Sequence, residues 1–411
     1  MIPAFSGNGL AMRAGRNLQA LAGEFTVHLL VVAMYGGQEG EPEEEVIRLC
    51  ASWRRILAPV PAAKKWRWSL FNFLKWGQGR LPAEWSGWTA RNEKEAAAYF
   101  AETKCERLWV FRFYLLPWAR AWLDGGGEAW LDIDEMESGA RESQAGLLSL
   151  AGEKTAAARL RGDAGLYRGL EERHLRRFGR IVTASELEAE RVAAKLQEEA
   201  VVTWPNVVAI PDGVPGASKD SGDSVWRLLF VGSLGHFPNR EAIHFAAREV
   251  LPRLQALIPQ PVVLCVAGAG ADAHREAFRG LPHVEWLGTV ADLGPTYAMA
   301  DLVLVPLRAG GGTRIKILEA FAHGKPVVST HTGAEGLRGL ERGRELLLAD
   351  DPAEIAAACA DLFYDAQKRE ALAANGRACV AERYSPANLG ALAAALRGEM
   401  DATRAGSRGR E

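Results

Sequence analysis

The sequence predicts an α/β protein with two doubly wound domains, each a parallel sheet covered by helices. Short apolar runs alternate with segments of helical periodicity along the chain, which is the pattern of βαβ units. Several runs are nearly continuous in Val, Leu and Ile, as expected for parallel strands buried on both faces. A polar stretch of small residues, Gly216 to Ser224, separates two such series and marks the domain boundary.

The first series begins with a glycine-containing loop. The segment Pro3 to Arg13, with Gly7 and Gly9, predicts a strand-to-helix loop, and Arg13 to Ala22 is expected to be helical. No apolar run precedes this loop, although the first strand of a doubly wound sheet is central and its loss leaves backbone hydrogen bonds unmade. We therefore expect a translation start upstream of Met1 that supplies this strand; the alternative is a disordered N-terminus.

The first domain is expected to span residues 1–215. Its further strand candidates are Thr26–Met34, Leu108–Phe113, Glu128–Asp132, Ile181–Ala184 and Val207–Ile210. Long helical patterns cover Glu135–Arg161 and Leu166–Phe178.

The second domain, expected over residues 225–384, continues the alternation. Its strand candidates are Trp226–Val231, Val262–Ala267, Val284–Leu287, Leu302–Val305, Pro326–Ser329 and Glu345–Leu348. A helix over residues 385–398, with Gly398 as its stop, is expected to pack back toward the first domain. Residues 399–411 are expected to form a disordered tail.

Composition limits the classes of function. With 411 residues, of which 48% are hydrophobic, the chain is long enough for two or three domains with their own cores. The net charge of −2 gives no reason to expect nucleic acid as a partner. The five cysteines are scattered, without CxxC or metal-ligand spacing, which favours reduced thiols in the cytoplasm. No run reaches the roughly 18 to 20 apolar residues needed to span a bilayer.

The most informative stretch follows the apolar run Leu302–Leu307. It consists of Gly310, Gly311, Gly312 and Thr313 and of a helical segment carrying Arg314, Lys316 and Glu319. Free N–H groups at a helix start bind phosphate, glycines permit close approach, and two basic side chains add full charges. The carboxylate of Glu319, about one turn further on, suits sugar hydroxyls. This local chemistry indicates a nucleotide sugar.

Longer motifs surround this stretch. They are LLFVGSLGHFPNREAIHFAAREVLPRL (Leu228–Leu254), VEWLGTVADL (Val284–Leu293) and ADLVLVPLRAGGGTRIKILEAFAHGKPVVSTHTGAEGL (Ala300–Leu337), with weaker matches at GNGLAMRAG, LDIDEMES, IVTASELEAERV and VVAIPDGV in the first half. On these motifs nearly the whole chain resembles the GT-B glycosyltransferases of family 4, the glycosyl transferases group 1. The resemblance implies two Rossmann-like domains facing across a cleft and sugar transfer with retention.

The resemblance also implies roles for single residues. Arg314 and Lys316 would neutralise the diphosphate of the donor without a bound metal or cofactor, and Glu319 would hold the ribose hydroxyls. Glu319 is the second glutamate of the family's spaced pair, whose first glutamate falls at Gly311 here, so backbone groups of Gly310 to Thr313 are candidate substitutes. The less specific candidates are Gly232, Ser233 and Gly268 on the donor side, His236 or Arg240 as the basic residue that the family often has in the loop after Ser233, and Gly7, Gly9, Arg112 and Asp132 on the acceptor side.

The acceptor is expected to be a glycan or a lipid-linked sugar of cell-surface polysaccharide synthesis. Residues 48–88 contain six tryptophans and eight basic residues against one glutamate, and Lys64 to Trp76 suits anionic lipid headgroups at the inner face of the cell membrane. The alternative is an ordinary helix whose aromatic side chains cover the sheet. We expect a cytoplasmic protein in either case.

Three other functions fit parts of the sequence. A GT-B nucleotide-sugar epimerase needs acid and base groups over the donor sugar, and a non-catalytic sugar-nucleotide-binding protein should lack the basic pair. Gly268 to Ala273 fits the dinucleotide fingerprint, with Glu285 on the next strand, and alone would predict an NAD-dependent dehydrogenase. That strand, however, is not the first of its domain.

Overall fold

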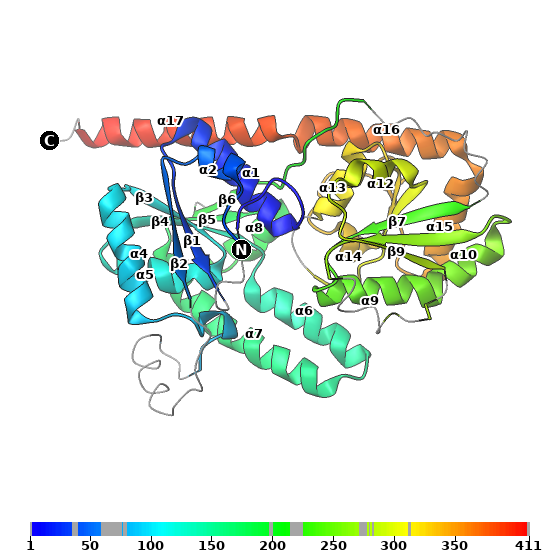
Figure 1. Ribbon diagram of the computed structural model, residues 1–411, viewed down its shortest axis with the longest axis horizontal. Helices are drawn as coiled ribbons and strands as arrows, with labels where there is room; N and C mark the ends of the chain where they lie inside the picture. The colour runs from blue at the N-terminus through cyan, green and yellow to red at the C-terminus, as the bar shows by residue number, and fades with distance from the viewer. Residues whose placement is uncertain are drawn as a thin grey trace. The chain divides into compact units, whose positions relative to one another are not determined.

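The computed structural model describes residues 2–34, 40–58, 76, 80–196, 200–213, 225–270, 278, 280–281, 283–310 and 314–408, with side chains to residue 402. The chain divides into two compact units (Figure 1). Unit 1 comprises Met1–Ser6, Leu10–Pro205 and Leu389–Glu411, and unit 2 comprises Gly7–Gly9 and Asn206–Asn388. Each unit combines parallel strands with helices, so the predicted α/β class is confirmed.

The strands described in unit 2 form one parallel sheet. Within the described residues its strand order is β12-β11-β10-β7-β8-β9. The strands are β7 (Trp226–Val231), β8 (Val262–Ala267), β9 (Val284–Gly288), β10 (Leu302–Val305), β11 (Val327–Ser329) and β12 (Leu347–Leu348). The main helices are α9 (Phe237–Phe245), α10 (Leu251–Leu257), α12 (Leu293–Met299), α13 (Ile315–Ala322), α14 (His331–Ala334), α15 (Pro352–Tyr364) and α16 (Ala366–Arg383).

The central strands of unit 2 form where the sequence is continuously apolar. β7, β8 and β10 have the bounds expected from their Val, Leu and Ile runs, and almost all of their residues are buried. Helices cover both faces of the sheet, with α9 and α10 on one side and α13 on the other (Figure 1). The chain winds outward in both directions from β7 and β10, so the order of connection reverses between these two strands.

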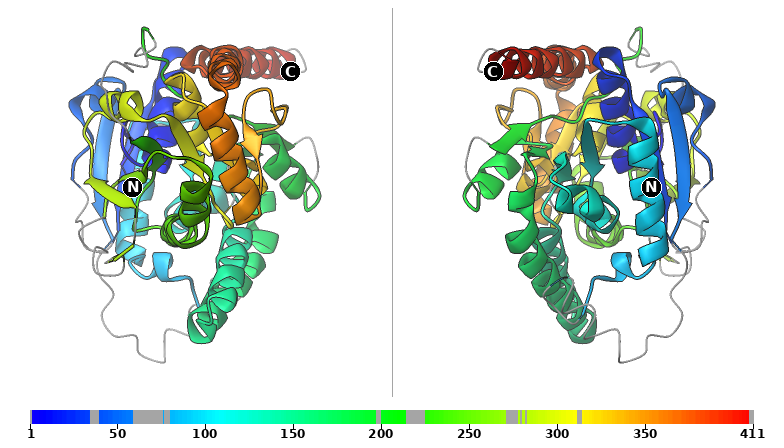
Figure 2. Two further views of the ribbon diagram at one scale, coloured as in Figure 1. Left: turned by 90° about the vertical axis from the view of Figure 1, so that its right-hand side faces the viewer. Right: turned by 90° about the vertical axis from the view of Figure 1, so that its left-hand side faces the viewer.

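The described residues of unit 1 form two parallel sheets, β1-β2 and β3-β4-β5-β6. The strands are β1 (His28–Ala33), β2 (Ser52–Leu57), β3 (Arg107–Phe111), β4 (Glu128–Asp134), β5 (Arg180–Thr183) and β6 (Val201–Thr203). The main helices are α1 (Gly9–Glu24), α2 (Glu44–Arg48), α4 (Ala90–Thr103), α5 (Leu116–Asp124), α6 (Glu137–Leu150), α7 (Lys154–His174), α8 (Glu186–Ala193) and α17 (Pro386–Arg408). α6 and α7 pack side by side as a helical pair (Figure 2).

Several expected elements differ in the structure. Val207–Ile210 is not a strand: the Val208 N–H donates to the Tyr384 carbonyl at 3.0 Å, and β6 pairs with β5 instead. β2 was not predicted, because Arg54 and Arg55 interrupt its apolar pattern. The expected helix over Glu135–Arg161 breaks between α6 and α7, where Gly152 has a φ of +82°.

The C-terminal helix passes through Gly398 and continues to Arg408, over most of the expected tail. Contacts to the rest of unit 1 offset the cost of a glycine in a helix, which is about 1 kcal/mol. Arg397 Nη1 donates to the Glu24 carbonyl at 2.6 Å, and Arg180 pairs with Glu399 at 2.6 Å. Among the helices of the described residues, none is both long and apolar enough to cross a membrane.

The core of unit 1 contains three of the six tryptophans of residues 48–88. Trp76, Trp85 and Trp88 are each at most 3% exposed, and the ring of Trp76 lies 4.7 Å from that of Trp85 and 5.7 Å from that of Trp88. Trp76 therefore packs inside unit 1 against two other tryptophans. Lys64, Lys65, Arg67 and Lys75 lie outside the described residues.

Candidate functional site

The candidate site of unit 2 lies where the strand order reverses. β7, β8 and β10 are neighbours at this point, and their carboxyl ends lead into the loops that carry Gly232 and Ser233, Gly268, and Gly310. Ligands of open parallel sheets bind at such a reversal, because the loops there separate to opposite faces of the sheet. The fold thus brings Gly232 and Gly268 together and places Gly310 after the neighbouring strand β10.

Two of these glycines are in direct backbone contact. A Cβ atom on Gly268, whose φ is +156°, would lie 2.0 Å from the Gly232 carbonyl oxygen. The Gly232 N–H donates to the Ala267 carbonyl at 2.9 Å, and the Gly268 N–H donates to the Gly288 carbonyl at 2.8 Å. Any larger residue at position 268 would push the two loops apart, so the glycine there is a packing requirement of the site.

Lys316 reaches these loops from the first turn of α13. Its Nζ donates to Asn239 Oδ1 at 2.9 Å and lies 4.1 Å from the centroid of the Phe230 ring. A Cβ on Gly232 would be 2.9 Å from this Nζ, so glycine leaves room for the ammonium group. Burial and, to a smaller extent, the charge of Arg314 lower the pKa of Lys316 to about 7, although Glu319 opposes the shift. An anion bound here would favour the protonated ammonium.

Glu319 lies about one turn after Lys316 on α13. Burial raises the pKa of its carboxyl group to about 7, although Lys316 and the Tyr297 hydroxyl both favour the charged form. Burial and the carboxylate together hold the pKa of Tyr297 well above its usual range. Glu319 therefore changes between a neutral acid and a hydrogen-bond acceptor near neutral pH.

Arg314 precedes α13 and occupies its N-cap position, with φ −81° and ψ 87°. The Arg314 side chain lies against Gly310: a Cβ on this glycine would be only 3.0 Å from Arg314 Nη2. Gly310 has a φ of +108°, which only glycine adopts without strain. Gly311, Gly312 and Thr313, the remaining donor-side candidates, lie outside the described residues.

Asn239 on α9 is a site residue that the sequence did not reveal. Its Nδ2 donates to the Ser233 carbonyl at 2.8 Å while its Oδ1 accepts from Lys316, so one side chain connects the loop after β7 to the lysine of α13. The signal available in the sequence was an asparagine at the start of the helix that follows the glycine-containing loop. Of the two basic loop candidates, His236 is exposed, and Arg240 donates to the Leu234 and Gly235 carbonyls at 2.7 and 3.0 Å.

The acceptor-side candidates of unit 1 are buried in ion-pair networks. Asp132 is fully buried; its Oδ1 accepts from Arg13 at 2.8 and 3.0 Å, and its Oδ2 accepts from Asn17 at 2.6 Å. Burial raises the pKa of Asp132 even so, although Arg13 opposes the shift. Both carboxylate oxygens thus accept hydrogen bonds within unit 1, as in the ion-pairing role that was the alternative to contact with a sugar.

Arg112 occupies a strained position at the end of β3. Its φ is +76°, and its guanidinium donates to Glu137 at 2.5 and 3.0 Å and to Asp134 at 3.2 Å. These carboxylates raise the pKa of Arg112 well above its usual value against the effect of burial. Gly7 has a φ of +90°, and Gly9 is the first residue of α1.

The dinucleotide fingerprint is only partly described. Gly268 and Gly270 follow β8, while Ala271 to Ala273 lie outside the described residues. Glu285, expected to reach a ribose in a dehydrogenase, has its Oε2 3.8 Å from Cys265 Sγ. Among the described residues no group of three or more His, Cys, Asp or Glu side chains is placed to hold a metal ion.

Residues 226–365 match the family described as glycosyl transferases group 1. This segment includes the loops after β7, β8 and β10 and the whole of α13. The expected resemblance to group 1 is therefore confirmed for the part of the chain that carries the candidate site. No curated protein matches the chain in sequence.

Solved structures share the fold. Anabaena HepE in complex with UDP and glucose superposes with a TM-score of 0.60 at 14% identity, covering 90% of this chain and 98% of its own. A glycosyltransferase from Rickettsia africae gives a TM-score of 0.62 at 11% identity, covering 97% and 96% of the two chains. Sucrose-phosphate synthase from Thermosynechococcus elongatus gives 0.57 at 15% identity, covering 92% and 99%. These matches confirm the GT-B fold class.

Proposed function

Because residues 226–365 belong to the glycosyl transferases group 1, we propose that the protein transfers a sugar from a nucleoside diphosphate sugar to a glycan or lipid-linked acceptor. The observation that carries this proposal is the placement of Lys316 at the strand-order reversal. Its half-buried ammonium donates to Asn239 and lies against Gly232, where a Cβ would be only 2.9 Å away, and Glu319 follows one turn later. An ammonium in this position suits the diphosphate, and the carboxylate suits the ribose.

We propose that the reaction retains the configuration of the sugar and needs no metal. The bond between the anomeric carbon and the β-phosphate oxygen breaks as the acceptor oxygen attacks from the same face. The leaving diphosphate takes the acceptor proton, while Lys316 and Arg314 stabilise the negative charge that develops on it. No glutamate occupies position 311, so the donor sugar is gripped by other groups, for which the backbone around Gly310 is the candidate.

The proposed donor is a uridine diphosphate sugar. The HepE structures contain UDP, UDP with glucose, and UDP-glucose, which makes UDP-glucose the first donor to test. UDP-, GDP-, ADP- and TDP-sugars are compared by thermal shift, since a ligand that binds the folded state raises the melting temperature. We expect a shift with one base, lost in Arg314→Ala and Lys316→Ala. The matched control is Lys368→Ala, which removes an exposed lysine of the same unit.

Product analysis separates the alternatives. A transferase releases the nucleoside diphosphate only when an acceptor is present, whereas an epimerase changes the sugar and releases no nucleotide. A binding protein shows the thermal shift without either product. The absence of a shift with all four donors would contradict the proposed site.

We further propose a peripheral contact with the inner face of the cell membrane through the basic residues of 48–88. Lys64, Lys65, Arg67 and Lys75 carry this charge, and replacing all four by Glu should release the protein from anionic liposomes. Unchanged partitioning would contradict the contact.

A further inference from the structure

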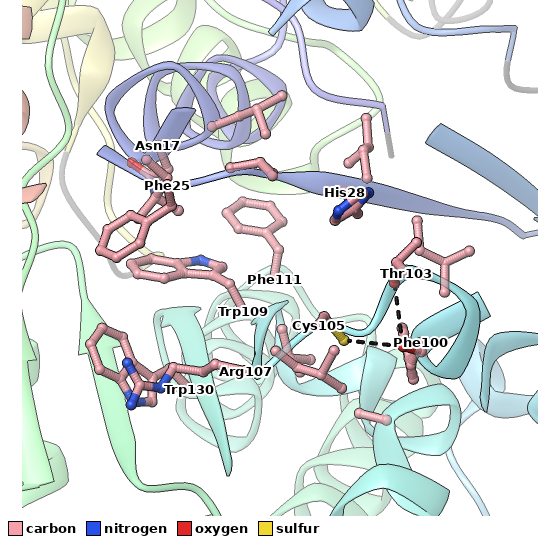
Figure 3. Close-up of a pocket in the computed structure, with 18 of the residues that line it drawn as sticks. Asn17, Phe25, His28, Phe100, Thr103, Cys105, Arg107, Trp109, Phe111 and Trp130 are labelled. Atoms are coloured by element: carbon pink, nitrogen blue, oxygen red, sulfur yellow. Dashed lines mark hydrogen bonds between the residues drawn. The ribbon is translucent and has the colours of Figure 1, made fainter. Parts of the chain in front are cut away.

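Unit 1 contains a cavity of about 650 Å³ that is lined by β1 and β3 (Figure 3). Its lining is mostly apolar. Among its polar side chains, Thr103 and Cys105 donate to the Phe100 carbonyl at 3.3 and 3.6 Å, and His28 Nδ1 lies 2.8 Å from Ser52 Oγ. These three groups are satisfied within unit 1, so they do not specify the chemistry of a ligand.

Tyr297 on α12 of unit 2 is a buried polar side chain of a different kind. It is fully buried, and its hydroxyl makes no regular hydrogen bond to any residue that the structure describes. The hydroxyl nevertheless lies close enough to the Glu319 carboxyl to favour the charged form of that group. A buried hydroxyl without a regular hydrogen bond costs stability, because its lost contact with water is not replaced. Its presence in the site therefore needs a reason other than stability.

The Tyr297 ring lies against the face of α13 that carries Glu319. It stacks on the His323 ring, with the two centroids 4.4 Å apart and the ring planes 13° apart. His323 follows Glu319 by four residues, and its N–H donates to the Glu319 carbonyl at 3.0 Å. Side chains four residues apart lie on one face of a helix, so the stack places the phenol beside the Glu319 side chain.

A second contact fixes the end of α12 against α13. Lys325 is 5% exposed, and its Nζ donates to the carbonyls of Ala298 and Ala300 at 3.1 and 2.8 Å. The Lys325 N–H donates to the Ala320 carbonyl in α13 at 2.9 Å. One buried lysine thus joins the two helix ends. Tyr297 directly precedes this anchor, so its phenol cannot leave α13 without breaking buried hydrogen bonds.

Glu319 needs such a neighbour if it holds a ribose. Two ribose hydroxyls require a charged carboxylate that accepts from both, whereas burial raises the pKa of Glu319 to about 7. A hydroxyl that donates to one carboxylate oxygen favours the charged form and leaves lone pairs for the ligand. Lys316 also favours the charged form, but its ammonium donates to Asn239.

We propose that Tyr297 is a positioning residue for ribose recognition: its hydroxyl donates to Glu319 when a nucleotide binds and holds the carboxylate in place for the ribose hydroxyls. The bond becomes regular in the complex, as hydrogen bonds of ligand-free sites often do. This inference rests on the proposed function and adds to it the residue that lets Glu319 distinguish ribose from 2′-deoxyribose. A site that pairs with a hydroxyl rejects the analogue that lacks it.

The test compares UDP with 2′-deoxy-UDP in the variant Tyr297→Phe, which removes the hydroxyl and keeps the ring that stacks on His323. Dissociation constants are measured by calorimetry, and the melting temperature is measured without nucleotide. The matched control is Tyr364→Phe, which removes a hydroxyl that donates to the Leu257 carbonyl at 3.0 Å from an exposed tyrosine of the same unit. Glu319→Gln and the variant with both changes complete a double-mutant cycle.

We expect the unaltered protein to bind UDP at least about tenfold more tightly than 2′-deoxy-UDP. Tyr297→Phe should lower this preference about fivefold, because it weakens UDP binding and leaves 2′-deoxy-UDP nearly unchanged. The melting temperature without nucleotide should stay the same or rise, since the change removes a buried hydroxyl without a regular hydrogen bond. In Glu319→Gln, the added change Tyr297→Phe should not alter the preference. Tyr364→Phe should keep it.

Equal weakening of UDP and 2′-deoxy-UDP in Tyr297→Phe would show a packing role and overturn the proposal. An unchanged preference in this variant would overturn it as well, while leaving nucleotide binding in place. If the unaltered protein binds both nucleotides equally, Glu319 does not hold the ribose and the proposal fails with that role. If the unaltered protein binds neither nucleotide, the proposed donor site itself is contradicted, so the two failures are distinguishable.

Discussion

The protonation of Lys316 should control donor affinity near neutral pH. Its pKa is lowered to about 7 in the free protein, chiefly by burial, and a bound diphosphate must raise it. Binding therefore favours the protonated form, and affinity is lost as pH rises above the free pKa. At about pH 8.5 roughly one molecule in thirty carries the ammonium, so affinity should fall about fifteen-fold from its value at about pH 7, which is about 1.6 kcal/mol.

Isothermal titration calorimetry with UDP-glucose measures this effect at constant ionic strength. Two buffers of different ionisation enthalpy report the proton taken up on binding. Lys316→Arg is the matched variant, because arginine stays charged throughout this range, and its affinity should be nearly independent of pH. Asn239→Asp places a carboxylate 2.9 Å from the ammonium in place of the amide oxygen, which should move the loss of affinity to higher pH.

Glu319 titrates near the same pH and needs its own control. Its carboxylate raises the pKa of Lys316, so in Glu319→Gln the loss of affinity should persist and begin at lower pH. A flat affinity between about pH 7 and about pH 8.5 in the unaltered protein, together with weak binding by Lys316→Ala, would refute the reasoning. Lys316 would then be fully charged before the donor arrives.

Three further predictions concern packing. Gly268→Ala places a Cβ 2.0 Å from a carbonyl oxygen of the neighbouring loop and should abolish the UDP-glucose thermal shift. The control Gly343→Ala, with φ +84° and no atom within 4 Å of the new Cβ, should keep the shift. Equal thermal shifts in the two variants would contradict the role of the Gly268 contact. Arg13→Leu leaves the buried carboxylate of Asp132 without its ion pair and should lower the free energy of unfolding, measured with urea, by about 3 to 5 kcal/mol. An unchanged urea midpoint would show that this ion pair does not stabilise unit 1. Trp76→Ala should lower the free energy of unfolding by about 3 to 5 kcal/mol without altering liposome binding. Loss of liposome binding at unchanged stability would contradict this and indicate that the Trp76 side chain contacts the membrane.

The second half of the chain was the more predictable half. β7, β8 and β10 coincide with their predicted runs, because a strand buried on both faces needs continuous apolar residues and its ends are marked by turns. Arg314, Lys316 and Glu319 lie within two turns of one helix start, so local spacing was enough to group them. β2 was missed because its two arginines conceal its apolar residues.

The sequence by itself determined the α/β class, the parallel strands of unit 2 and the basic loop-to-helix segment, since each depends on residues that are close along the chain. Only the tertiary structure decided that Asn239 bonds to Lys316, that Asp132 pairs with Arg13, that Trp76 is buried in the core, and that β1 and β3 line one cavity. These facts depend on contacts between distant segments. Burial and hydrogen bonding determine what a side chain does, and neither can be read from the residues next to it in the sequence.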